Sequence, residues 1–397
     1  MKIKKILAVI CAMSIIAGVL SACGGQEFHK KVTSADFDYE QLDSSKYDVA
    51  KYTTPFWEGN IVYNEFVYPI MNEENILAPF ELMYYADEIV SVRDHTLEHT
   101  YVEGIDYILS EGKLVVLPNG NIRVKMQEDI HQKSNPNNYP ITYMYPHLDG
   151  EGFEYWNDQD IHNRMLVVTY IHNDKWDMIV PQSAADKLTK TMEKLENGEP
   201  LSIVFTGDSN AVGFNSSRIM ATKPYADGYT IMAVKALREK YSGNIKFANT
   251  AVGGSNASFT EEQLEADILR YNPDLVVIAF GMNDAQMHTV QQYKDNINGR
   301  IEYIKRNLPD CEILLVTTML ANPWVFDAET YKEFASALYD VEQQWDGVGL
   351  CDPQALQLSL METKGKEFLC FMGDNLVHPN DYGMRIIAQC VIAALSE

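Results

Sequence analysis

Residues 201–209 read LSIVFTGDS, and this stretch indicates the fold of the C-terminal part of the chain. A short apolar and β-branched run, Leu201 to Thr206, is followed directly by Gly207-Asp208-Ser209. A run of this length, bounded by turn residues, is typical of a buried strand. Ser209 would then stand at the carboxyl end of the strand, the edge at which open α/β sheets bind their ligands.

Further buried-type strands are expected downstream, with helical stretches between them, at residues 245–250, 275–280 and 312–318. Alternation of this kind predicts a parallel sheet covered by helices on both faces. Ser183 is the expected cap of a helix before the sheet, and a last helix is expected from Asp381 to about Leu395. We therefore predict a three-layer α/β domain over residues 182–397.

The preceding part of the chain has a different pattern. Short strand-like runs occur at residues 88–92, 107–109, 114–117, 122–124 and 165–170, and turn signals separate several of them. Short strands with close turns predict an all-β, sandwich-like domain over residues 47–181.

The first 22 residues have the features of an export signal. Lys2, Lys4 and Lys5 precede an apolar run of fifteen residues, Ile6 to Leu20. That run would extend about 22 Å as a helix, which is too short for a hydrocarbon core of about 30 Å. Leu20-Ser21-Ala22-Cys23 resembles the lipobox of bacterial lipoproteins, in which Cys23 becomes lipidated. We expect a signal peptide (1–22), a polar tether (23–46) and a protein anchored to the outer face of the membrane; the alternative is an ordinary secretory signal.

The composition is strongly acidic, with a formal net charge of −24. Residues 1–22 contain three lysines and no acidic residue, so their removal would change the net charge to −27. Such a charge disfavours nucleic acid and anionic lipid headgroups as partners, whereas a neutral ester meets no such repulsion. The cysteines beyond Cys23 lack zinc or redox spacing; we expect them to be buried and unpaired, although export permits a disulfide.

Three further sequence blocks accompany Gly207-Asp208-Ser209, each at the end of a predicted strand or before the last helix. They are Asn249-Thr250-Ala251-Val252-Gly253-Gly254-Ser255, Gly281-Met282-Asn283-Asp284 and His378-Pro379-Asn380. Together the four blocks resemble those of the SGNH/GDSL hydrolase family, over roughly residues 183–397. This resemblance implies a flavodoxin-like three-layer fold and an esterase that needs no cofactor.

The resemblance also implies roles for individual residues. Ser209 would attack the ester carbonyl, and the oxyanion would be held by the N–H of Ser209, the N–H of Gly254 and the amide of Asn283. The family spacing selects Gly254, and Gly253 is the alternative if the turn is shifted by one residue.

His378 is the expected general base, because an imidazole titrates near neutrality. His288 is the other histidine of this domain, and we expect it to be a solvated surface residue. The acid is open. The family places aspartate three residues before the histidine, but this position is Asn375, and Asp374 lies one residue earlier. The ring would be oriented by Asp374 in a triad, or by Asn375 or a backbone carbonyl in a dyad.

No metal site is predicted. His95 and His99 have the i, i+4 spacing of helical ligands, but the residues around them favour strand and turn.

These patterns predict a cell-surface serine esterase that acts on acyl esters, acetyl esters of carbohydrates above all. The carbohydrate assignment rests on resemblance to two-domain carbohydrate esterases. A lipase, a thioesterase or an acyltransferase would use the same residues. The alternative from another class is a non-catalytic glycan- or solute-binding lipoprotein.

Overall fold

The computed structural model describes residues 47–71, 76–126, 129–134, 144–155, 159–241 and 244–397. The predicted signal peptide, the tether and Cys23 lie outside the described residues.

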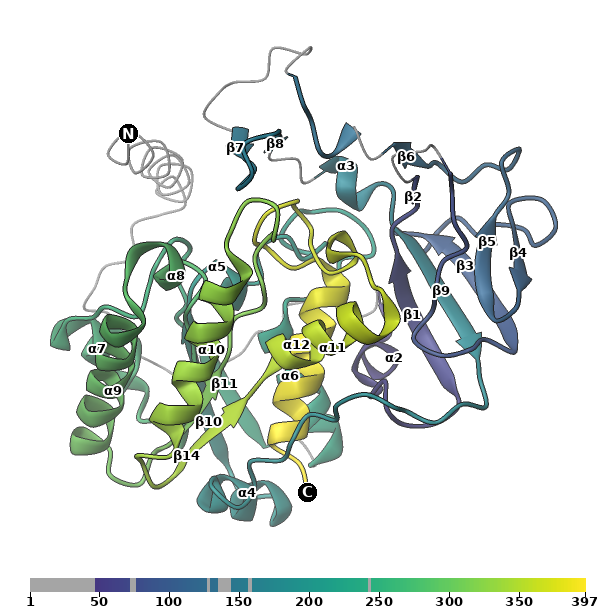
Figure 1. Ribbon diagram of the computed structural model, residues 1–397. Coiled ribbons are helices and arrows are strands. Elements are labelled where there is room, and N and C mark those ends of the chain that lie inside the picture. The colour runs from purple at the N-terminus through teal and green to yellow at the C-terminus, as the bar shows by residue number, and fades with distance from the viewer. Residues whose placement is uncertain (1–46, 72–75, 127–128, 135–143, 156–158, 242–243) are drawn as a thin grey trace.

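A five-stranded parallel sheet forms the centre of the C-terminal domain (Figure 1). Its strand order is β11-β10-β12-β13-β14, with bounds β10 (Leu201–Gly207), β11 (Ile245–Asn249), β12 (Leu275–Ala279), β13 (Glu312–Val316) and β14 (Val348–Cys351). The first four strands confirm the prediction. The sequence did not reveal β14, because it has only four residues and one of them is Gly349.

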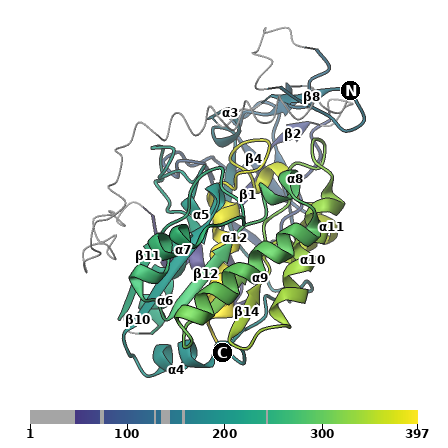
Figure 2. The same cartoon turned by 90° about the vertical axis from the view of Figure 1, so that its left-hand side faces the viewer.

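Helices cover both faces of the sheet (Figures 1 and 2). The helices are α4 (Thr189–Glu196), α5 (Ser209–Val212), α6 (Tyr229–Lys240), α7 (Glu261–Asp267), α8 (Asp284–Met287), α9 (Val290–Asn307), α10 (Ala328–Glu342), α11 (Pro353–Lys364) and α12 (Asp381–Ala394), with short 3-10 turns η5 (Leu269–Tyr271) and η6 (Phe368–Cys370). Among the residues that the structure describes, no helix combines the length and apolar character that a membrane crossing requires.

The alternation of side chains along each strand divides the core into two layers. Val204 and Ile278 belong to a cluster with residues of α7, α9 and α10. Phe205 and Val277 belong to a cluster with residues of α6 and α12 on the opposite face. The sheet with helices on each of its two faces forms the predicted three-layer arrangement.

The helix predicted from Ser183 begins six residues later, at Thr189. Ser183 Oγ accepts the N–H of Ala185 at 3.1 Å and donates to the carbonyl of Ser396. The N–H of Ala184 donates to the carbonyl of Ala394 at 2.9 Å. Residues 183–184 are therefore tied to the end of the chain and do not start α4.

The N-terminal region is rich in β-structure, as predicted. A three-stranded antiparallel sheet has the order β1-β9-β3, with β1 (Ile61–Val67), β3 (Glu88–Asp94) and β9 (Leu166–Ile171). Two-stranded pairs join β4 (Tyr107–Ser110) to β5 (Lys113–Val116), β2 (Ile70–Met71) to β6 (Lys125–Met126) and β7 (Met144–Pro146) to β8 (Phe153–Tyr155); the helices are α2 (Val49–Thr53) and α3 (Gln159–His162).

Two features of this region differ from the prediction. Residues 122–124 are not a strand, and β6 follows them. The strand β1 was not predicted, because a register shift between Val62 and Glu65 interrupts its alternation. Asn64 has a positive φ of 53° within that shift.

The N-terminal region packs against α12 through a buried arginine. Arg385 Nη2 donates to the carbonyls of Lys51 (3.1 Å) and Thr54 (3.4 Å), and Nη1 donates to the carbonyl of Tyr63. The guanidinium also lies over the ring of Phe56, 4.3 Å from its centroid. Its charge is therefore solvated by backbone carbonyls and an aromatic face instead of water.

A buried ion pair joins the same two parts of the chain. Glu65 in β1 pairs with Lys366, which follows α11, and both side chains are almost fully buried. One apolar cluster runs through both parts. The predicted division at residues 181 and 182 falls between β9 and α4, and it stays a prediction.

Replacement of Arg385 by alanine should lower the free energy of unfolding by about 2–4 kcal/mol, because buried carbonyls lose their donor. Arg306→Ala is the matched control, since Arg306 is 58% exposed in its pair with Glu261 and should contribute less than about 1 kcal/mol. Urea unfolding of both variants measures the difference. Equal midpoints would show that the Arg385 contacts do not hold the two parts together.

Candidate active site

The turn after β10 presents Ser209 as the first residue of the short helix α5. The Asp208 carboxylate caps this helix by accepting the N–H of Asn210 at 2.9 Å. Gly207 is required at the turn, because a Cβ there would lie 2.4 Å from the carbonyl oxygen of Ala279. The Gly-Asp-Ser order therefore fixes the place of the serine at the sheet edge.

Ser209, His378 and Asp374 form one hydrogen-bonded series. His378 Nε2 lies 2.9 Å from Ser209 Oγ, and His378 Nδ1 lies 2.5 Å from Asp374 Oδ2. All three side chains are buried, Asp374 completely. With a proton on Nδ1, the ring donates to Asp374 and Nε2 accepts the serine hydroxyl. This arrangement can withdraw the serine proton during nucleophilic attack.

Asp374 also shapes the loop that carries His378. Its Oδ1 accepts backbone N–H groups of Leu376 (2.9 Å), Val377 (2.8 Å) and His378 (3.1 Å). The N–H of Gly373 donates to the carbonyl of His378 at 2.8 Å and closes the loop. A spacing of four residues between acid and histidine is accommodated in this way.

The Asn375 side chain is directed elsewhere. Its Nδ2 donates to Glu154 Oε2 at 2.9 Å. The backbone carbonyl of Asn375 accepts Asn322 Nδ2 at 2.5 Å. Of the three alternatives left open by the sequence, the structure brings Asp374 to His378 Nδ1.

The pKa of Asp374 is set by two opposing effects. Burial raises it, but the charge and the hydrogen bond of His378, together with backbone N–H donors, bring it below its ordinary value. Asp374 is therefore ionised at neutral pH and can stabilise an imidazolium.

The two predicted oxyanion donors beyond Ser209 follow the two strands that flank β10. Gly254 follows β11, has a positive φ of 77°, and would direct a Cβ into open space. Asn283 follows β12 and its Nδ2 donates to the carbonyl of Ser255 at 2.7 Å. Because a primary amide carries two N–H bonds, this contact fixes the group while leaving a second donor.

Two buried acids near these loops were not assigned from the sequence. Asp284 Oδ1 accepts the N–H of Ala257 at 2.9 Å and contacts His288 Nδ1 at 2.9 Å. His288 also lies 3.3 Å from Ser258 Oγ, so the expectation of a solvated surface histidine was wrong. Burial raises the pKa of Asp208 to about 7. Both acids lie in the quoted sequence blocks. Asp208 directly precedes Ser209 and Asp284 directly follows Asn283, and these positions could have indicated that both acids lie near the site.

The N-terminal region reaches the loops of this site. His162 Nε2 lies 3.0 Å from the carbonyl oxygen of Asn215, six residues after Ser209. The N–H of Leu148 donates to the carbonyl of Trp324 at 2.9 Å.

The remaining cysteines and two further histidines lie away from the Ser209 series. Among the described residues, Cys311, Cys351, Cys370 and Cys390 are free and buried. His95 and His99 line a surface cavity beside β3. The described residues contain one group with the spacing to hold a metal ion, namely His131, His147 and Glu154. This group was not predicted from the sequence.

Comparisons with known proteins agree with the four blocks. Residues 205–386 match the GDSL-like Lipase/Acylhydrolase family. No curated protein matches the chain.

Two solved structures are similar to part of the chain. One is a two-domain esterase active on acetylated mannans, co-crystallised with mannopentaose, with 21% identity and a TM-score of 0.43; the match covers 53% of this chain and 53% of that one. The chain thus matches about half the length of that esterase. The other is an acetylxylan esterase from Geobacillus stearothermophilus, with 18% identity and a TM-score of 0.42, covering 50% of this chain and 94% of that one.

Residues 205–386, which carry the serine-bearing turn, the ordered blocks and the strands between them, are therefore similar to the GDSL-like Lipase/Acylhydrolase family.

Proposed function

We propose that the protein is a cell-surface serine esterase that hydrolyses acyl esters, acetyl esters of carbohydrates above all. The observation that carries the proposal is the buried series Ser209–His378–Asp374, with contacts of 2.9 and 2.5 Å. In the proposed mechanism, Ser209 Oγ attacks the ester carbonyl while His378 Nε2 takes its proton. The N–H groups of Ser209 and Gly254 and the amide of Asn283 hold the negative oxygen.

The remaining steps use the same residues. His378 gives its proton to the departing alcohol, and an acyl group stays on Ser209. A water molecule, deprotonated by His378, then attacks this acyl-enzyme, and His378 returns the proton to Ser209 Oγ as the carboxylic acid leaves. Asp374 keeps the imidazole in the required tautomer throughout.

A carbohydrate carrier is supported by the position of the N-terminal region. This region contacts the loop after Ser209 through His162 and the Asp374 loop through Glu154. A substrate larger than its acyl group would meet these residues beside the site. The exposed ring of Trp324 offers an apolar face of the kind on which sugar rings stack.

A hydrolysis screen tests the proposed substrate class. Acetylated oligosaccharides and p-nitrophenyl esters of increasing chain length are offered to the wild-type protein, with Ser209→Ala as the inactive reference. We expect release of acetate from the oligosaccharides and a decline of kcat/KM with acyl length. The alanine variant should lose about 10³-fold or more in kcat, whereas Ser110→Ala, at an exposed position in β4, should not. A preference for long acyl chains would favour a lipase or thioesterase.

Replacement of Asp374 by asparagine should lower kcat by about 10²- to 10⁴-fold, because the neutral amide cannot stabilise imidazolium. The asparagine oxygen can still accept the backbone N–H groups of the loop. Asn375→Ala should change kcat by less than about tenfold. Steady-state rates with p-nitrophenyl acetate distinguish the two positions; similar losses in both variants would remove the special role of Asp374.

The proposed surface location depends on Cys23. In bacteria that express the chain, Cys23→Ala should abolish incorporation of a labelled fatty acid and release the protein from the membrane fraction. Cys11→Ala is the matched control and should leave both unchanged. Membrane attachment that persists in the Cys23 variant would argue against a lipid anchor.

A further inference from the structure

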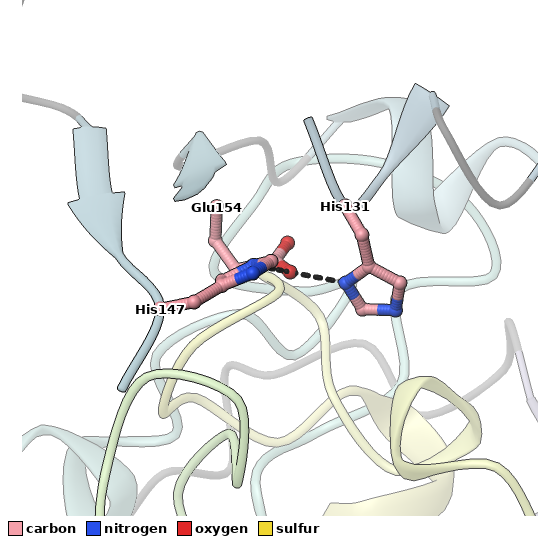
Figure 3. A group of neighbouring side chains, drawn as sticks. All are labelled: His131, His147 and Glu154. Carbon is pink, nitrogen blue, oxygen red and sulfur yellow. Dashed lines mark hydrogen bonds and ion pairs between the residues drawn. The ribbon is translucent and has the colours of Figure 1, made fainter. Parts of the chain in front are cut away.

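Three side chains of the kind that bind metal ions converge outside the Ser209 series (Figure 3). His131 Nδ1 lies 2.5 Å from Glu154 Oε1, and His147 Nε2 lies 3.0 Å from the same oxygen. The three ligand atoms all lie within 4.8 Å of one another. Around a tetrahedral zinc ion with bonds of about 2.0–2.1 Å, neighbouring ligand atoms are about 3.3 Å apart. Shifts on the order of 1 Å would therefore place all three around one ion.

Backbone hydrogen bonds hold the three ligand-bearing segments together. His147 directly follows β7, and Glu154 is the central residue of β8, which pairs with β7. Gln132, next to His131, exchanges two backbone hydrogen bonds with Phe153, of 3.1 and 2.9 Å. The chain thus brings the ligands together before any ion binds.

The surroundings of Glu154 fit a metal ligand. Its side chain is fully buried, and a buried carboxylate requires compensation of its charge. Oε1 faces both rings, while Oε2 accepts Asn375 Nδ2 at 2.9 Å. An outer hydrogen bond of this kind orients a ligating carboxylate. The ring of Trp324 lies 4.3 Å from that of His131 and 5.6 Å from that of His147, which adds an apolar wall.

An ion can reach the group from one side. The His131 side chain is 18% exposed and lines a cavity of about 400 Å³. Two imidazoles with one carboxylate favour zinc or a related transition metal over calcium or magnesium, which prefer oxygen ligands.

We propose that His131, His147 and Glu154 bind one divalent transition-metal ion of the zinc type, and that this ion positions the loop of the active site. The connection runs from the ion through Glu154 to Asn375, the residue after Asp374. The site is a positioning site, because its residues do not belong to the Ser209 series. Metal binding is independent of the esterase activity, whereas its effect on turnover rests on the proposed function.

Calorimetric titration of the untagged, chelator-treated protein with zinc chloride tests the site. We expect one ion per chain, with binding weakened at least about 100-fold in His147→Ala. Glu154→Gln preserves the shape of the side chain and should also weaken binding strongly. Asn375→Ala removes only the outer hydrogen bond and should weaken it about tenfold or more. His99→Ala, which removes an exposed histidine, is the matched control and should bind zinc as the wild type does.

Two results would overturn the proposed site. One is the absence of stoichiometric zinc binding by the wild-type protein. The other is an equal loss in the His99 and His147 variants, which would indicate adventitious binding by surface histidines. Circular dichroism of each variant verifies its fold, and Glu154→Gln keeps the test decisive if His147→Ala does not fold.

The positioning role is tested by adding zinc to the same metal-free samples. Zinc should raise the melting temperature and the kcat of the wild-type protein towards an acetyl ester, but change neither in His147→Ala. Magnesium should have no effect on either. Stoichiometric binding without any change in kcat would overturn the positioning role. If zinc binds but no preparation hydrolyses esters, the proposed esterase function fails and the metal site stands.

Discussion

The contact between Asp374 Oδ2 and His378 Nδ1, 2.5 Å long and fully buried, is the interaction on which the rest of the site depends. A carboxylate removed from water needs several donors. Asp374 obtains them from the imidazole and from three backbone N–H groups of its own loop. The same bonds set the direction of the ring toward Ser209. The loop geometry and the proposed chemistry therefore have a common cause.

The extra residue between acid and histidine has a consequence outside the site. Asp374 contacts His378, whereas the side chain of the adjacent Asn375, which is also buried, contacts Glu154. This contact links the C-terminal domain to β8, while Arg385 and the Glu65–Lys366 pair link the two parts at other places. The N-terminal region is thus integrated with the C-terminal domain through buried polar contacts. Its residues can influence the loops that hold Ser209 and His378.

The sequence predicted the features that depend on local pattern. Apolar runs identified β10 to β13, and the four blocks identified the residues that meet at the sheet edge. It did not predict β14, whose four residues include a glycine, or β1, whose alternation is broken at Asn64. The choice between Asp374 and Asn375 depends on loop hydrogen bonds that no spacing rule contains. His131 and His147 are 23 and 7 residues from Glu154, separations that match no metal-binding motif, so only the folded chain reveals their proximity.

Covalent labelling with a fluorophosphonate tests the central claim most directly, because this reagent reacts only with a serine activated by a base and an oxyanion site. Intact mass measurement and peptide mapping identify the modified residue. We expect a single adduct on Ser209, formed rapidly in the wild-type protein and lost in His378→Ala. A folded wild-type protein that remains unlabelled, or an adduct on another serine, would contradict this claim.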